Sequence, residues 1–91
     1  MVMDLKRYKV GVLRGGPSLE REISLLSGAS VVKALESMDF EVEDIVVPTK
    51  RDLEYLGDWT LSVLKEKNID VCFIALHGWF GEEGSIQKIL S

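Results

Sequence analysis

The sequence predicts an α/β fold, in which a parallel sheet is flanked by helices to give three layers. Three apolar segments rich in β-branched residues, 8–13, 42–47 and 71–76, predict strands. Helical patterns occupy the intervening segments, at about 18–38 and 59–67. Because strands and helices alternate along the chain, a parallel sheet with right-handed crossovers is expected.

The boundaries of these elements follow from local signals. The first and third apolar segments are nearly continuous in apolar residues, which predicts strands covered on both faces. Pro48 ends the second strand because proline cannot donate to a sheet ladder. Gly57 closes a turn before the second helix, and Asp58 is its expected N-cap. A glycine-rich loop, 78–84, then leads into the first turns of another helix at 85–90.

The composition is that of one small globular domain, with 91 residues of which 46% are hydrophobic and 29% charged. The formal net charge of −4 argues against a nucleic-acid or membrane surface as partner. Cys72 is the only cysteine, which excludes an internal disulfide, and we expect it to be inert core packing. The sequence has neither a membrane-spanning stretch nor a signal peptide. We therefore expect a cytoplasmic protein.

The last predicted helix has little sequence after it. Ile86, Ile89 and Leu90 form an apolar set with almost no following chain to cover it. We therefore expect residues 1–91 to be one domain of a larger protein, docked through this end. Trp79 and Phe80, in the preceding loop, are expected to contribute to the exposed docking surface.

A helical wheel of the first helix singles out Glu20. Charged residues of the solvent stripe include Glu22, Lys33 and Glu36. The opposite arc contains apolar and small residues: Ile23, Ser24, Ser27, Gly28, Val31, Ala34, Leu35 and Met38. Glu20 falls in the middle of this arc, where a carboxylate needs a partner, so it is expected to project into a crevice at the carboxyl edge of the sheet. Alternatively, Glu20 and Glu22 are both first-turn acids that the helix dipole favours.

His77, the only histidine, directly follows the third strand. Open α/β sheets bind ligands outside the carboxyl ends of their strands, where the strand order reverses. In a Rossmann-like sheet of order 2-1-3, the loops after the first and third strands are neighbours. Glu20 and His77 are then expected to share one crevice. The alternative is an exposed loop histidine without a function.

The glycines after the first strand do not indicate a nucleotide site. Gly15 and Gly16 lie in a run, 11–17, that matches neither GxGxxG nor a P-loop. Pro17 removes a backbone donor that a phosphate could use. The second strand, moreover, ends without the acid that would hold a ribose. Dinucleotide binding is therefore disfavoured.

Two segments resemble motifs of the D-alanine–D-alanine ligases. The segment 15–25, GGPSLEREISL, followed by Ser27 and Gly28, resembles the amino-terminal block of that family. The segment 75–87, ALHGWFGEEGSIQ, resembles its HGxxGEDG signature. Both motifs occur in the family's order and at a comparable spacing. Glu83 stands where aspartate is usual and Lys88 where a small residue is usual; neither is one of the predicted functional residues.

The resemblance implies an ATP-grasp ligase that joins two D-alanines for peptidoglycan through an acyl phosphate. By this resemblance, Glu20 is the catalytic and substrate-binding residue that holds the ammonium of the first D-alanine. His77 lines the same subsite, and Glu82 orients the histidine. The remaining motif residues are expected to support the site: Gly15, Gly16, Ser24, Gly78 and Gly84.

The resemblance also implies that other domains bind the cofactors, ATP and Mg²⁺. Residues 1–91 then form a single amino-terminal, pre-ATP-grasp domain that binds substrate, holds neither cofactor alone and is inactive in isolation. Its partners are D-alanine and the rest of the ligase chain, and the full-length ligase is expected to be a homodimer. Two alternatives remain open: a D-alanine–D-lactate or D-alanine–D-serine ligase domain, and a stand-alone, non-catalytic module for a small ligand.

Overall fold

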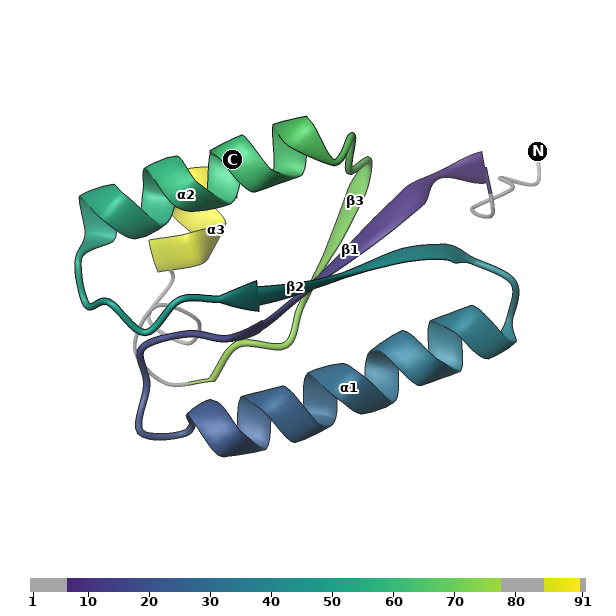
Figure 1. Ribbon diagram of the computed structural model, residues 1–91, viewed down its shortest axis with the longest axis horizontal. Coiled ribbons are helices and arrows are strands. Elements are labelled where there is room, and N and C mark those ends of the chain that lie inside the picture. Colours follow the sequence, from purple (N-terminus) through teal and green to yellow (C-terminus); the bar gives the residue numbers. More distant parts are fainter. Residues whose placement is uncertain (1–6, 78–84, 91) are drawn as a thin grey trace.

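The computed structural model describes residues 7–77 and 85–90, which form a parallel sheet with helices on both faces (Figure 1). The elements follow one another as β1 (Lys9–Gly15), α1 (Arg21–Ser37), β2 (Glu41–Val47), α2 (Leu53–Glu66), β3 (Val71–Ile74) and α3 (Ser85–Leu90). The strand order is β2-β1-β3, and β1 pairs in parallel with both neighbours. The predicted α/β class and the 2-1-3 order are confirmed.

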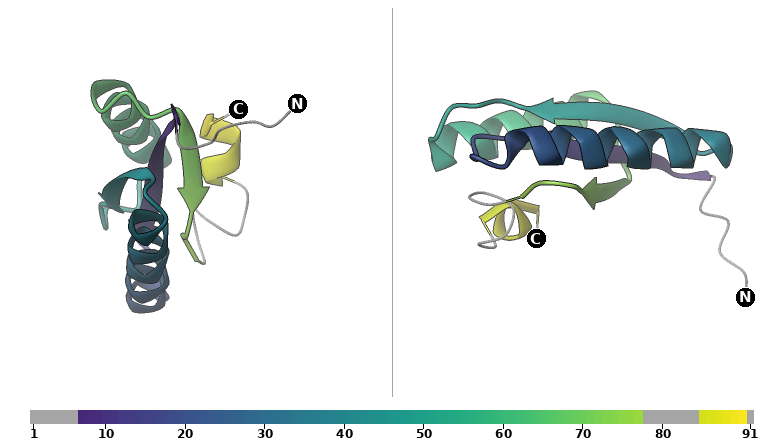
Figure 2. Two further views of the ribbon diagram at one scale, coloured as in Figure 1. Left: turned by 90° about the vertical axis from the view of Figure 1, so that its right-hand side faces the viewer. Right: turned by 90° about the horizontal axis from the view of Figure 1, so that it is seen from below.

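The two faces of the sheet are covered differently. Helix α1 lies on one face, and α2 and α3 lie on the other (Figure 2). The main core lies between the sheet and α2 and α3, and its buried residues are Leu13, Ile45, Val47, Leu56, Leu76 and Ile86. Val10 and Val12 of β1 are buried as well, and they point to the opposite face of the sheet from Leu13 because side chains alternate along a strand. Strand β1 is thus covered on both faces, as the sequence predicts.

Helix α1 approaches the sheet through its smallest side chains. Ser24 and Gly28 are its only fully buried residues, and a Cβ added at Gly28 would lie 2.5 Å from Cβ of Arg14. The wheel prediction is wrong for several apolar positions, since Ile23 and Met38 are 59% and 49% exposed and Ala34 is exposed as well. Because contact is made through one narrow line of small residues, side chains on either side of it stay in water.

Strand β3 is covered on one face only, contrary to the prediction for the third strand. Val71 and Phe73 are 43% and 46% exposed, because they share the α1 face of the sheet and α1 packs mainly over β1 and β2. Cys72 is half-buried rather than fully enclosed, and burial raises the pKa of its thiol.

The second helix begins earlier than predicted. The Asp52 side chain accepts a hydrogen bond from the backbone N–H of Tyr55 at 3.1 Å and caps α2, so the expected cap, Asp58, lies inside the helix. Gly57 is likewise helical rather than the end of a turn. The first helix begins at Arg21 instead of residue 18, after a turn in which Arg21 N–H donates to the Ser18 carbonyl.

Helix α3 packs against α2 instead of presenting an open apolar set. Ile86 is fully buried in the main core, and Ile89 and Leu90 pack against it. The expectation that these three residues form an uncovered surface is therefore wrong. Trp79 and Phe80, the other residues of the expected docking surface, lie outside the described residues.

Candidate substrate site

The turn between β1 and α1 depends on two glycines. Gly15 and Gly16 have φ angles of +90° and +81°, in the left-handed region that side chains other than glycine rarely adopt. The Gly16 N–H donates to the Val47 carbonyl at 3.0 Å, which ties the turn to the end of β2. An added Cβ at Gly15 would lie 2.9 Å from Nη1 of Arg21. The two glycines therefore bring the chain sharply from β1 to the start of α1, where Glu20 lies.

Ser24 links the ends of β1 and β3 beneath the first turn of α1. The Gly15 N–H donates to Ser24 Oγ at 2.8 Å, and the Ser24 hydroxyl donates to the Ala75 carbonyl at 2.6 Å. The Ser24 side chain is completely buried. Its hydroxyl therefore satisfies two backbone groups that are both close to predicted site residues, Gly16 directly after β1 and His77 in the segment after β3.

His77 follows β3 and lies beside α1. Its Nε2 atom is 3.3 Å from Oγ of Ser27, one turn after Ser24, and the residue is half-buried. The first turns of α1 thus run along the carboxyl ends of β1 and β3, and Glu20 is the N-cap of this helix. This arrangement agrees with the topology that was expected to bring Glu20 and His77 together. A shared crevice for the two side chains stays a prediction.

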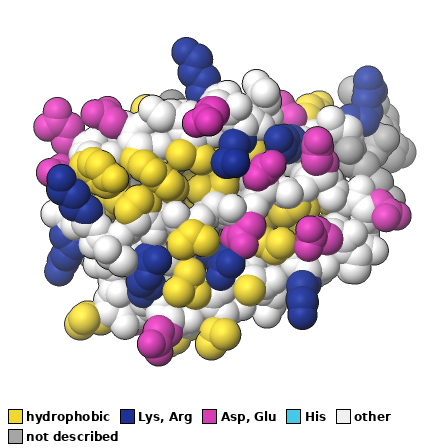
Figure 3. Space-filling view, in the orientation of Figure 1, with side chains coloured by type: hydrophobic (Ala, Val, Ile, Leu, Met, Phe, Trp, Pro, Cys, Tyr) yellow, Lys and Arg dark blue, Asp and Glu magenta, His cyan; other side chains and the backbone are white. Residues whose placement is uncertain are grey.

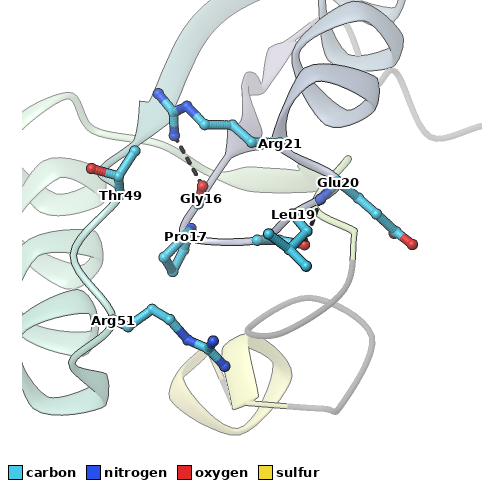
Figure 4. Close-up of a pocket in the computed structure, with 8 residues that line it drawn as sticks. Gly16, Pro17, Leu19, Glu20, Arg21, Thr49 and Arg51 are labelled. Carbon is cyan, nitrogen blue, oxygen red and sulfur yellow. Dashed lines mark hydrogen bonds between the residues drawn. The ribbon is translucent and has the colours of Figure 1, made fainter.

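Glu20 lies on the wall of a pocket of about 470 Å³ at the carboxyl edge of the sheet (Figure 4). The residues that line the pocket are Gly16, Pro17, Ser18, Leu19, Glu20, Arg21, Thr49 and Arg51. Glu20 is exposed at the N-cap position of α1, and its carboxylate makes no capping hydrogen bond. In Figure 4 this carboxylate points away from Thr49 and Arg51. Glu22 is exposed too, as predicted for the solvent stripe.

The pocket includes residues that the sequence analysis missed. It lies between the loops after β1 and β2, whereas the prediction concerned the loops after β1 and β3. Arg21 connects the two loops on one side of the pocket, because its Nη1 atom donates to the carbonyls of Gly16 at 3.0 Å and Val47 at 2.8 Å. The polar run that contains Thr49 and Arg51, directly after an apolar strand, was the available signal for this second loop.

Arg14 joins α1 to two strands. Its Nε and Nη2 atoms donate to the two carboxylate oxygens of Asp44 at 2.6 and 2.7 Å, and Nη1 donates to the Leu25 carbonyl at 2.9 Å. Hydrogen bonding from Arg14 holds the pKa of the Asp44 carboxyl below its ordinary value, and the same pairing raises the pKa of Arg14. The bidentate pair joins β1 to β2, and the bond to the Leu25 carbonyl ties Arg14 to the helix that carries Ser27.

Three predicted site residues, Gly78, Glu82 and Gly84, lie outside the described residues. Within 7–77 and 85–90, no group of three or more histidine, cysteine, aspartate or glutamate side chains could hold a metal ion. No helix in the same ranges is long and apolar enough to cross a membrane. Side chains of both charges are interspersed on the face shown in Figure 3, with hydrophobic side chains exposed among them.

A comparison with protein-family models finds no match. Among curated proteins, one from Clostridium botulinum strain 657, named D-alanine–D-alanine ligase, is 45% identical over 82 residues, which are 90% of this chain and 24% of that protein. A Geobacter sulfurreducens protein of the same name is 46% identical over 87 residues, which are 96% of this chain and 25% of that protein. This chain is a homologue of D-alanine–D-alanine ligases.

The chain spans about a quarter of the length of the curated relatives that it matches. The match to the Geobacter ligase covers 87 of the 91 residues, so it includes both segments that resemble the ligase motifs. The resemblance that gives Glu20 and His77 their expected roles therefore extends over nearly the whole chain.

Proposed function

We propose that the chain is the amino-terminal substrate domain of an ATP-dependent D-alanine–D-alanine ligase, and that it contributes the subsite for the first D-alanine. The observation that carries this proposal is the 45–46% identity to ligases over 90–96% of the chain; the longer of these two matches includes both motifs. The complete ligase would act in the cytoplasm, as a homodimer, to supply the dipeptide for peptidoglycan.

Glu20 would bind the ammonium group of the first D-alanine. Glu20 lines the pocket and is exposed, and its carboxylate is not used to cap α1, so it is available to a cationic ligand beside the pocket. An ion pair with charge-assisted hydrogen bonds is the ordinary way to hold an ammonium group. His77, two residues beyond the carbonyl to which Ser24 donates, would line the same subsite.

The remaining chemistry would come from the rest of the ligase chain. ATP with Mg²⁺ supplies the phosphoryl group that activates a carboxylate toward an amine. We assign both cofactors to the rest of the ligase chain, as the resemblance to the family implies. Backbone N–H groups at the start of α1 would favour negative charge that develops on the reacting group.

A chimeric enzyme tests this proposal. The matching quarter of the Geobacter ligase is replaced by this chain, and D-alanine-dependent phosphate release and dipeptide formation are measured. We expect the chimera to make the dipeptide and the 91-residue chain alone to show only background release. A folded chimera that binds ATP but makes no dipeptide would contradict the proposal, as would turnover that co-purifies with the isolated chain.

A further inference from the structure

The turn that carries Glu20 is closed by the side chain of the next residue, Arg21. Its Nη1 atom donates to the carbonyl of Gly16, earlier in the same turn, at 3.0 Å (Figure 4). The same atom donates to the carbonyl of Val47, at the end of β2, at 2.8 Å. A terminal guanidinium nitrogen has two hydrogens, so Nη1 can satisfy both carbonyls at once. The segment 16–21 is therefore a closed loop that is fastened to β2.

The other hydrogen bonds of this turn join neutral groups. The Gly16 N–H donates to the Val47 carbonyl at 3.0 Å, and the Glu20 N–H donates to Ser18 Oγ at 3.0 Å. The second of these bonds lies within the turn and is exposed to solvent. Hydrogen bonds from an ionised donor are stronger than bonds between neutral groups. The Arg21 side chain is therefore the strongest tie between the turn and β2.

Gly15 leaves room for this guanidinium. A Cβ added at Gly15 would lie 2.9 Å from Nη1 of Arg21 and 3.2 Å from the carbonyl oxygen of Val47. A side chain at this position would thus displace the nitrogen from one of its two acceptors. The glycine before the turn and the arginine after it are consequently matched to each other.

We infer that Arg21 is a positioning residue for Glu20. The two residues are neighbours in the chain, and their side chains leave it in different directions (Figure 4). Because the Arg21 side chain is held at the end of β2, the backbone at residue 20, and with it the direction of the Glu20 side chain, is held as well. This inference deepens the proposed D-alanine subsite, and it rests on the proposed function for the identity of the ligand.

NMR relaxation of the backbone amides in the 91-residue chain tests the geometric part without a ligand. Arg21→Met removes both bonds of Nη1 and keeps a long side chain. A rigid backbone has an order parameter of about 0.85, and a flexible one has less than about 0.6. We expect the order parameter of Glu20 to fall from the first value to the second, while those of β1 stay unchanged. An unchanged order parameter at Glu20 overturns the inference.

Asp44→Asn is the matched control. The pair of Arg14 and Asp44 also joins β1 to β2 through an arginine, but it lies before the turn instead of within it. Its weakening should leave the order parameter of Glu20 as in the wild type. If Asp44→Asn loosened Glu20 as much as Arg21→Met, the effect would come from the strand pair as a whole, and the inference would be wrong.

A double-mutant cycle in the chimeric ligase tests the functional part. Arg21→Met should raise the KM for D-alanine about 2- to 150-fold, the range for coupling between neighbouring residues. In a chimera that already contains Glu20→Gln, the same change should have little effect, because Arg21 acts through Glu20. The KM for ATP should stay as in the unchanged chimera. Equal effects of Arg21→Met in the two backgrounds are typical of a merely structural role and overturn the inference.

The two experiments separate this inference from the proposed function. An unchanged chimera that folds and binds ATP but makes no dipeptide contradicts the proposed function, and the order parameters still decide whether Arg21 holds Glu20. A chimera that makes the dipeptide and shows equal effects in the two backgrounds contradicts the role of Arg21 alone.

Discussion

Replacing Ser24 by alanine should weaken the whole end of the sheet at which the site is built. In the wild type, the Ser24 hydroxyl accepts from the Gly15 N–H at 2.8 Å and donates to the Ala75 carbonyl at 2.6 Å. Ser24 is 0% exposed, so water does not replace these bonds without a rearrangement. Alanine fits the same space but leaves a donor and an acceptor unsatisfied.

The expected magnitude follows from these two groups. An unsatisfied buried donor costs about 1–3 kcal/mol, and a carbonyl with one lost partner costs about 1 kcal/mol. We therefore expect Ser24→Ala to lower the free energy of unfolding by about 2–4 kcal/mol, a large share of the 5–15 kcal/mol that is typical of a domain. Urea denaturation, monitored by circular dichroism, measures this change in unfolding free energy. The slope of the free energy against urea concentration should stay as in the wild type.

Ser30→Ala is the control, because Ser30 is exposed and its hydroxyl donates to the Leu26 carbonyl of the same helix. We expect that variant to stay within about 0.5 kcal/mol of the wild type. If Ser24→Ala also stayed within that limit, the argument that Ser24 joins β1 to β3 would be refuted.

The remaining predictions concern the packing of α1 and α2. Because Arg14 lowers the pKa of Asp44 in the folded state, the pair stabilises the fold above the ordinary aspartate pKa of about 4, and this contribution is lost as the pH falls through the lower folded pKa. Wild type should lose unfolding free energy between about pH 7 and pH 3, and Asp44→Asn should lose about 0.5–1 kcal/mol less, a modest difference because the pair is partly exposed. Urea denaturation of both proteins at the two pH values measures these losses. Equal losses for the variant and the wild type would contradict this prediction. Gly28→Ala should destabilise the chain by about 1–3 kcal/mol, because its Cβ would lie 2.5 Å from Cβ of Arg14. Gly57→Ala, whose Cβ would lie 3.5 Å from Ile89, should instead stabilise it by up to about 1 kcal/mol, and thermal melts that showed the same sign for both would be inconsistent with this packing.

The fold could be predicted because its signals are local and repeated. Alternation of apolar and helical segments is sufficient for a parallel α/β sheet. The β2-β1-β3 order was expected from Rossmann-like sheets, because right-handed crossovers alone also allow the order 1-2-3. Helix boundaries were harder to predict than the order of the elements, because Asp52 and Asp58 are both suitable N-caps for α2. Gly57 suggested the later one, but a glycine inside a helix costs only about 1 kcal/mol, which additional turns and the Asp52 cap can offset.

Burial and site contacts depended on distant parts of the chain. The helical wheel identifies one face of α1 but not the width of the contact, which the small residues Ser24 and Gly28 restrict. Glu20 and His77 could be placed at the carboxyl edge from topology alone. Their neighbours could not: Ser27 and His77 are 50 positions apart in the sequence, and no periodicity within α1 reveals that contact.

The central claim is that Glu20, and not merely an acid in the first turn of α1, binds the ammonium of the first D-alanine. The most direct test compares the KM for D-alanine of two single variants of the chimeric ligase, Glu20→Gln and Glu22→Gln. Both glutamates are exposed at the start of the same helix, so an effect of the helix dipole would be similar for the two. We predict that Glu20→Gln raises the KM roughly 10- to 150-fold, the loss of one charge-assisted hydrogen bond, while Glu22→Gln leaves it unchanged. Equal KM values for the two variants would contradict the account.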